Sequence, residues 1–198
     1  MTDKHQSEKV IVVSGPSGVG KSTIVWRIVN EMDEVYLSVS ATTRARSESE
    51  VNGRDYWFVS REEFERGIEN GRFLEYAEVY GNLYGTPKDK VDEQLSAGRS
   101  VILEIDVQGG MQVKQRNPDA VMIFIVPPGR QELVKRLCSR GRDEQRVARI
   151  RLEGAEKEIK TAEKWYENMV VNDDLEKAVS QVKRIIQRSI GDKYDRET

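Results

Sequence analysis

The chain has 198 residues, with 32 lysines and arginines against 34 aspartates and glutamates, and a formal net charge of −2. This length suits one α/β domain with a modest insertion and is short for two domains with separate cores. The charge balance argues against a protein that coats nucleic acid, which normally carries a marked basic excess. We therefore expect no nucleic-acid partner.

Cysteine and histidine usage also limits the function. A single cysteine, Cys138, excludes an intrachain disulfide framework, and we expect a reducing, cytoplasmic compartment. The only histidine, His5, lies in a polar N-terminal stretch, which argues against histidine-based catalysis. That stretch has no apolar core of a secretion signal, and apolar runs such as VMIFIV are far shorter than the roughly 20 residues of a membrane span. We expect no membrane partner.

In chain order, the residues VIVV at 10–13 predict a buried strand, and a helical pattern follows a glycine-rich loop. Further β-rich runs predict strands at 35–40, 55–59, 100–106, 121–126 and 168–172. Helical patterns lie at 91–98, 133–137, 143–165 and 175–186. Alternating strands and helices, with mostly apolar strands, predict an α/β fold whose parallel central sheet is covered on both faces.

Residues 40–88 depart from this alternation. They contain five glycines, many aromatic residues and short strand signals without long helices. We interpret this segment as a small mixed α/β insertion.

The loop after the first predicted strand carries the clearest chemical motif. Gly15, Gly20, Lys21 and Ser22 complete the pattern G-x-x-x-x-G-K-S between a strand and a helix. Glycines let backbone N–H groups converge on a phosphate, the helix presents its positive end, and Lys21 adds a charge. The Ser22 hydroxyl would ligate Mg²⁺. The sequence thus predicts a nucleoside triphosphate site, formed by Gly15, Pro16, Ser17, Gly18, Val19, Gly20, Lys21, Ser22 and Thr23.

Six motifs occur together in order: GPSGVGKST (15–23), VSATTRARSESEVNGRDYWFVS (39–60), FLEYAEVYGNLYGTP (73–87), ILEIDVQG (102–109), RG (140–141) and VVNDDLEKA (170–178). This set resembles the guanylate kinase family, from about Lys9 to Ile190. The resemblance implies a three-layer P-loop NTPase fold and Mg²⁺-dependent transfer of the γ-phosphoryl group of ATP to GMP, giving ADP and GDP. It divides the chain into a core (9–39, 89–135 and 152–190), a GMP-binding insertion (40–88), a helical lid (136–151), a disordered tail (1–8) and a polar tail (191–198).

The resemblance assigns the GMP site to Ser40, Arg44, Tyr56, Glu75, Tyr84, Thr86 and Asp106. The chemistry of Glu75 fits, because its carboxylate can accept hydrogen bonds from both N1–H and the amino group of guanine. Adenine offers neither donor at those positions, so AMP should be rejected. The resemblance gives Ser40 and Thr86 to the base, and Arg44, Tyr56 and Tyr84 to the phosphate.

One segment departs from the family pattern T-T-R-x-x-R. This chain reads TTRARSESE, so Ser47 stands where the second arginine is usual and an arginine occurs at Arg46 instead. We hypothesise that Arg46 still contacts the GMP phosphate from this shifted position. The alternative is a solvated surface arginine.

Two carboxylates end the run VILEID. Glu104 and Asp106 are two residues apart, which on a strand would place both on one face. The resemblance puts this strand end beside the phosphate loop and the GMP site, where acidic groups hold the water shell of Mg²⁺. Ser22 would then be the only direct protein ligand of the metal.

The segment 136–151 contains six arginines. The resemblance makes it the lid, with Arg140 and Arg151 joining Lys21 and Arg44 as catalytic residues and Arg136 on the ATP side. A nucleic-acid-binding helix is the alternative interpretation, which the interleaved acidic residues disfavour. Asn172 matches a position near the adenine of ATP, or is simply a turn residue at a strand end.

Two other functions compete with the kinase. The first is a non-catalytic binding module of the same fold, and the second is a related P-loop kinase with another phosphorylated acceptor. The intact phosphate loop argues against the first, and Glu75 and Ser40 as guanine readers argue against the second. We expect a monomer or a homodimer that binds ATP and GMP.

Overall fold

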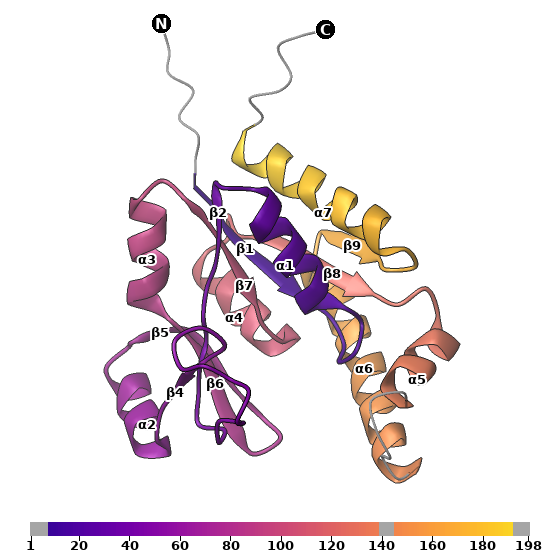
Figure 1. The fold of residues 1–198 in the computed structure, drawn as a ribbon, viewed down its shortest axis with the longest axis horizontal. Helices are drawn as coiled ribbons and strands as arrows, with labels where there is room; N and C mark the ends of the chain where they lie inside the picture. The colour runs from indigo at the N-terminus through magenta and orange to yellow at the C-terminus, as the bar shows by residue number, and fades with distance from the viewer. Residues whose placement is uncertain (1–7, 139–144, 192–198) are drawn as a thin grey trace, which may run out of the picture.

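The computed structural model describes residues 8–138 and 145–191. Within these ranges, the side chains of residues 136–138 and 145–151 are not described. Its centre is a parallel five-stranded sheet in the order β2-β7-β1-β8-β9 (Figure 1). The strands are β1 Val10–Ser14, β2 Val35–Leu37, β7 Ser100–Glu104, β8 Val121–Val126 and β9 Asn168–Val171. The predicted parallel central sheet is confirmed.

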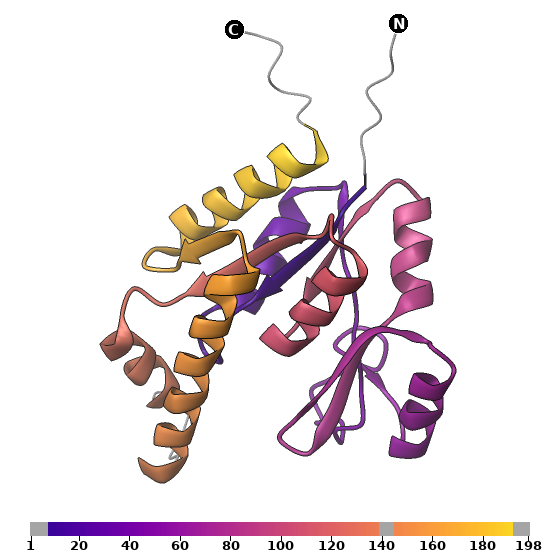
Figure 2. The same cartoon turned by 180° about the vertical axis from the view of Figure 1, so that it is seen from behind.

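Helices cover both faces of this sheet, which gives the three predicted layers (Figures 1 and 2). Because successive side chains of a strand point to opposite faces, Ile11 and Val13 pack in one core cluster and Val10 and Val12 in the other. The first cluster includes residues of α1 Lys21–Glu31 and α7 Leu175–Ile190. The second includes residues of α3 Lys88–Ser96, α4 Val107–Arg116 and α6 Gln145–Trp165.

A second sheet lies in the segment expected to be an insertion. Its order is β4-β3-β6-β5, formed by β3 Ala41–Thr42, β4 Trp57–Phe58, β5 Phe73–Val79 and β6 Asn82–Pro87. The helix α2 Arg61–Glu69 packs on it through the buried Phe64, whose ring stacks on Phe73 at a centroid distance of 4.3 Å. The small sheet is mixed, with one parallel and two antiparallel pairs.

The last described helical region lies beside the core. The helix α5 Arg130–Cys138 packs on α6 through Leu133 and Ala155. In both views, α5 with α6 and the small sheet with α2 extend downward from the central sheet, on separate sides of the molecule (Figures 1 and 2). None of the helices in the described ranges has the length and apolar character needed to cross a membrane.

Three sequence predictions of strands were too long by two or more residues. The run 35–40 is not one strand: β2 ends at Leu37, and the carbonyl of Ser40 instead accepts a hydrogen bond from Trp57 in the small sheet. The run 55–59 pairs only at Trp57 and Phe58. Asp106 is not a strand residue, because β7 ends at Glu104 and Asp106 caps α4. In the first and last cases an apolar residue, Val39 or Ile105, still follows the end of the strand, so the pattern does not mark where the chain leaves it.

Candidate active site

The phosphate loop is held by a hydrogen bond from Asn172, the residue that follows β9. Gly20 begins α1 in a left-handed conformation, with φ of 98°. The side-chain amide of Asn172 donates to the carbonyl of Val19 at 2.8 Å, and a Cβ atom on Gly20 would lie only 2.6 Å from that amide nitrogen. A glycine is therefore required here by backbone conformation and by close contact.

The two polar side chains that follow the loop are oriented inward. Lys21 Nζ donates to the carbonyl oxygens of Gly15, at 2.5 Å, and Pro16, at 3.3 Å, so its ammonium lies over the loop. Ser22 Oγ donates to the Glu104 carboxylate at 2.6 Å. A hydroxyl and a carboxylate thus meet at the mouth of the loop.

A cleft of about 540 Å³ opens between the phosphate loop and the small sheet. Its size is typical of a small-molecule site. The structure brings nine of the predicted site residues to its lining: Gly15, Ser17, Lys21, Ser40, Tyr56, Glu75, Tyr84, Glu104 and Asp106. These residues come from six separate stretches of sequence, so the tertiary fold assembles the cleft.

Glu75 is the most deeply buried carboxyl group of this cleft, with 3% of its surface exposed. Thr86 Oγ1 donates to Glu75 Oε1 at 2.6 Å, which places the predicted Thr86 behind the carboxylate. Burial raises the pKa of Glu75 to about 7, and the charge of Asp106 contributes to the rise. A buried carboxyl group that lines a cleft and whose pKa is raised by burial is typical of a functional site.

Arg44 lies over Tyr56, with its guanidinium carbon 5.4 Å from the ring centroid, and the Tyr56 and Tyr84 rings are 5.9 Å apart. The guanidinium makes a bidentate pair with Glu50, at 2.6 and 3.1 Å. This pair lowers the pKa of Glu50 to about 2. Sequence reasoning missed Glu50, although its position in the same loop as Arg44 was a usable signal.

Arg46 and Ser47 both donate hydrogen bonds to Glu50. Ser47 donates through its backbone N–H and its Oγ to the Glu50 carboxylate, at 2.9 and 2.7 Å. Arg46 is exposed and donates to the backbone carbonyl of Glu50 at 3.3 Å. In this structure Ser47 supports the partner of Arg44.

Glu158 on α6 is a cleft residue for which the sequence offered no signal, since it lies in a segment rich in alternating charges. It is partly buried, and this burial raises its pKa, while the positive charge of Lys21 opposes the rise. Gln108, beside Asp106, also lines the cleft.

The lid prediction falls largely outside the described residues. Arg140 lies between the described ranges, and the side chains of Arg136 and Arg151 are outside the described part of the chain. The same holds for Cys138. Their predicted roles stay predictions.

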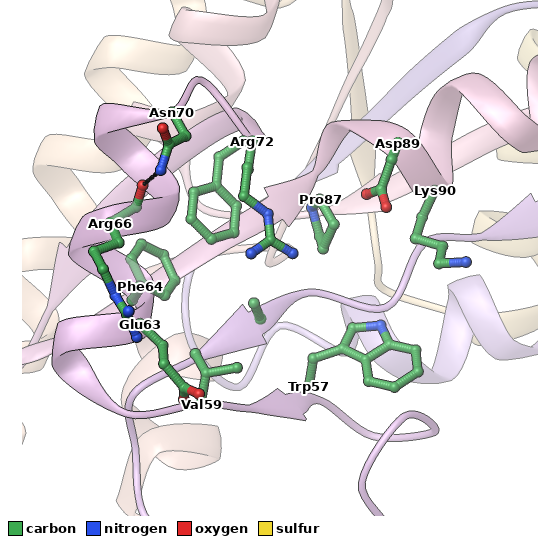
Figure 3. A pocket seen from close by; sticks show the side chains of 12 residues that line it. Trp57, Val59, Glu63, Phe64, Arg66, Asn70, Arg72, Pro87, Asp89 and Lys90 are labelled. Atoms are coloured by element: carbon green, nitrogen blue, oxygen red, sulfur yellow. Dashed lines mark hydrogen bonds between the residues drawn. The ribbon is translucent and has the colours of Figure 1, made fainter.

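A second hollow, of about 580 Å³, lies at the other face of the small sheet (Figure 3). Trp57, Val59 and Arg72 point into it. None of the predicted site residues lines it, and it is separate from the phosphate loop. The smaller cleft, which holds the loop lysine and the buried carboxylate, is therefore the candidate active site.

Comparisons with known proteins show the family of this chain. The family model described as guanylate kinase matches residues 7–189. A guanylate kinase of Rubrobacter xylanophilus is 49% identical over 182 residues, covering 92% of this chain and 95% of that protein. A guanylate kinase of Streptococcus thermophilus is 50% identical over 179 residues, covering 90% of this chain and 85% of that protein.

Solved structures show the same relation. The crystal structure of guanylate kinase from Anaplasma phagocytophilum has a TM-score of 0.78 and 33% identity, covering 95% of this chain and 89% of that chain. The SH3-kinase fragment of tight junction protein 3 has a TM-score of 0.52 at 11% identity, a likeness that shows the fold alone. By sequence over nearly its whole length, and by a fold that places a phosphate loop opposite a buried glutamate, this chain belongs to the guanylate kinase family.

Proposed function

We propose that this chain transfers the γ-phosphoryl group of ATP to GMP, with Mg²⁺, and gives ADP and GDP. The observation that carries the proposal is the position of Glu75, a buried carboxylate that lines the same cleft as Lys21. Its Oε1 accepts from Thr86, and the residue lines the cleft.

Glu75 would select the base. Ionised, it accepts from N1–H and from the exocyclic amino group of guanine in a two-point contact. Adenine lacks both donors on that edge and would leave the buried carboxylate unsatisfied, which costs on the order of 10⁴ in specificity at sites of this kind. Ser40 would add a further hydrogen bond, and Glu104 and Asp106 would border the nucleotide on the side of the phosphate loop.

Arg44, Tyr56 and Tyr84 would bind the GMP phosphate. The side chains of these three residues already contact one another, and Glu50 holds the guanidinium in place. Arg46 lies at the same loop and would reach the phosphate when GMP is bound. The phosphate oxygen that accepts the phosphoryl group is largely ionised at neutral pH, so the reaction needs no general base.

The residues near Ser22 fit a magnesium ion. Oxygen ligands suit Mg²⁺, and the Ser22 hydroxyl and the Glu104 carboxylate lie 2.6 Å apart. Among the described residues no group of three or more His, Cys, Asp or Glu side chains could hold a metal, so most ligands would come from water and the ATP phosphates. When bound with ATP, the ion would neutralise charge on the β- and γ-phosphates.

The remaining roles follow from family membership. Residues 15–23 would bind the ATP phosphates, and Arg136, Arg140 and Arg151 would approach them from a lid at 136–151. Lys21, Arg44, Arg140 and Arg151 would stabilise charge as the phosphoryl group moves between two anions held in line. Asn172, which donates to Val19, would act by holding the loop beside the adenine site. The insertion at 40–88 would move relative to the core when GMP binds, in a monomer or homodimer of the cytoplasm.

A coupled assay of ADP production tests the proposal, with ATP and Mg²⁺ fixed and GMP, AMP, CMP or UMP added in turn. Turnover with GMP alone is the expected result. Binding of GMP without turnover would instead indicate a non-catalytic module. Turnover only with another phosphorylated compound would indicate a kinase with a different acceptor.

A further inference from the structure

The strand that carries Glu75 is attached to the core by a helix and not only by its own sheet. β5 is an edge strand, with β6 on one side only. On its other side lies α4 of the core. The side-chain amide of Gln112 donates to the carbonyl of Tyr76 at 2.6 Å, and the Tyr76 N–H donates back to Gln112 at 3.4 Å. Arg116 donates to the carbonyl of Leu74.

These contacts flank Glu75 on both sides, at Leu74 and Tyr76. Three positions of α4 take part: 109, 112 and 116, whose spacing of three and four residues places them on one face of the helix. Backbone groups of an edge strand otherwise face solvent or a foreign strand. Here two core side chains satisfy them and fix the backbone at the position of the guanine reader.

Gly109, on the same face of α4, leaves room for the Glu75 side chain. A Cβ atom at this position would collide with the Glu75 carboxylate at Oε2. The other oxygen of the carboxylate, Oε1, accepts from Thr86 Oγ1. Glycine at this position therefore lets the carboxylate lie directly against the helix.

The start of α4 is in turn tied to the strand that precedes the phosphate loop. Asp106 caps the helix by accepting from the Gly109 N–H at 2.8 Å. Its backbone carbonyl accepts from Ser14 Oγ at 3.3 Å, and Ser14 accepts from the buried hydroxyl of Tyr166 at 2.8 Å. One helix thus connects the end of β1 to β5.

We propose that Gln112 is a positioning residue for base selection, acting through Glu75, and that Gly109 makes the room this requires. The inference rests on the proposed function, because it assumes that Glu75 reads guanine. A two-point contact depends on alignment, and displacement of a reacting or binding group by about 1 Å can cost on the order of 100-fold. By holding both flanking backbone positions, Gln112 and Arg116 keep Glu75 at a fixed distance from the phosphate loop.

The test compares Gln112→Ala and Gln112→Met with the control Gln115→Ala, which alters an exposed glutamine of the same helix. We expect the KM for GMP to rise about tenfold in both Gln112 variants, from the loss of two hydrogen bonds. The KM for ATP should stay within about twofold of the wild type. Gly109→Ala is an independent variant that should raise the KM for GMP as well, although alanine favours the helix itself.

The preference for GMP over IMP shows whether Gln112 orients the Glu75 carboxylate or only stabilises the fold. IMP lacks the exocyclic amino group, so the wild-type preference reports the second contact with Glu75. This preference should shrink in the Gln112 variants and stay unchanged in Gln115→Ala. In a double variant with Glu75→Gln, adding Gln112→Ala should raise the KM no further, because both changes remove the same interaction.

The outcomes distinguish this inference from the proposed function. If the wild type neither turns over nor binds GMP in preference to AMP, the proposed function fails. If the wild type is a GMP kinase but the Gln112 variants match Gln115→Ala, only the inference is overturned. Effects of Gln112→Ala and Glu75→Gln that simply multiply would also overturn it.

Discussion

Replacing Glu75 by glutamine should make the stability of the protein less dependent on pH. Glu75 has 3% of its surface exposed, and burial raises its pKa from 4.5 to about 7. The folded state therefore favours the protonated carboxyl. Its contribution to stability is fully present below the unfolded pKa of 4.5 and is lost as the pH rises through 7. A pKa shift of this size corresponds to about 3 kcal/mol of unfolding free energy.

Glutamine at position 75 has a similar shape and does not titrate, and Thr86 can still donate to its oxygen. Urea unfolding of both proteins at a series of pH values from 4.5 to 9 measures the effect. We expect the wild type to lose about 3 kcal/mol relative to Glu75→Gln across this range, with most of the change between pH 5 and 8. Parallel stability curves for the two proteins would refute the argument that Glu75 is buried with a raised pKa.

The same substitution has a second signature in GMP binding. Guanine donates to the ionised carboxylate, so the wild-type KM for GMP should fall as the pH rises through 7. The GMP phosphate also titrates near pH 6, but it does so equally for both proteins. The difference between the two pH profiles therefore isolates Glu75. A variant profile of the same shape as the wild type would show that Glu75 does not bind the base.

Four further substitutions test other parts of the site. Arg44→Ala should raise the KM for GMP about 50-fold, as expected for a charged hydrogen-bond donor to phosphate, and Arg46→Ala about threefold; an unchanged KM in Arg46→Ala would show that Arg46 is only a surface residue. Glu104→Gln should raise the Mg²⁺ concentration for half-maximal turnover about tenfold, because Glu104 holds the Ser22 hydroxyl, and an unaltered Mg²⁺ titration would contradict this role. Asn172→Ala should lower stability by about 1 kcal/mol and raise the KM for ATP about fivefold, since it leaves a buried loop carbonyl without its donor. Thermal unfolding and ATP titration measure both, and a loss of stability with an unchanged KM would limit Asn172 to a structural role.

Local patterns in the sequence were sufficient for the phosphate loop and the central sheet. The loop depends on glycines and on Lys21 and Ser22 at fixed spacing, and the Lys21 ammonium donates to two carbonyls of the same loop. The run at 121–126 coincides with β8, because a strand covered on both faces is apolar at nearly every position. Family resemblance added Glu75, Thr86 and Tyr84, which no periodicity could single out.

Boundaries between elements were harder to predict. Val39 continues the strand-like alternation of 35–40 past Leu37, where the chain passes from the central sheet toward the small sheet, so the pattern could not mark the end of β2. Asp106 looked like a strand residue because its neighbours are apolar, but its carboxylate satisfies the N–H of Gly109 at the start of α4.

The sequence by itself determined that this chain holds nucleoside phosphates on a glycine-rich loop, and its motifs indicated guanine as the acceptor base. Only the tertiary structure decided how the guanine reader is held. The placement of Glu158 in the cleft and the contacts of Gln112 with β5 depend on the fold, and the contact between α4 and β5 joins residues 36 positions apart. Such contacts leave no periodic trace in the chain, because they depend on which elements pack together, and packing is decided by the burial of the whole core.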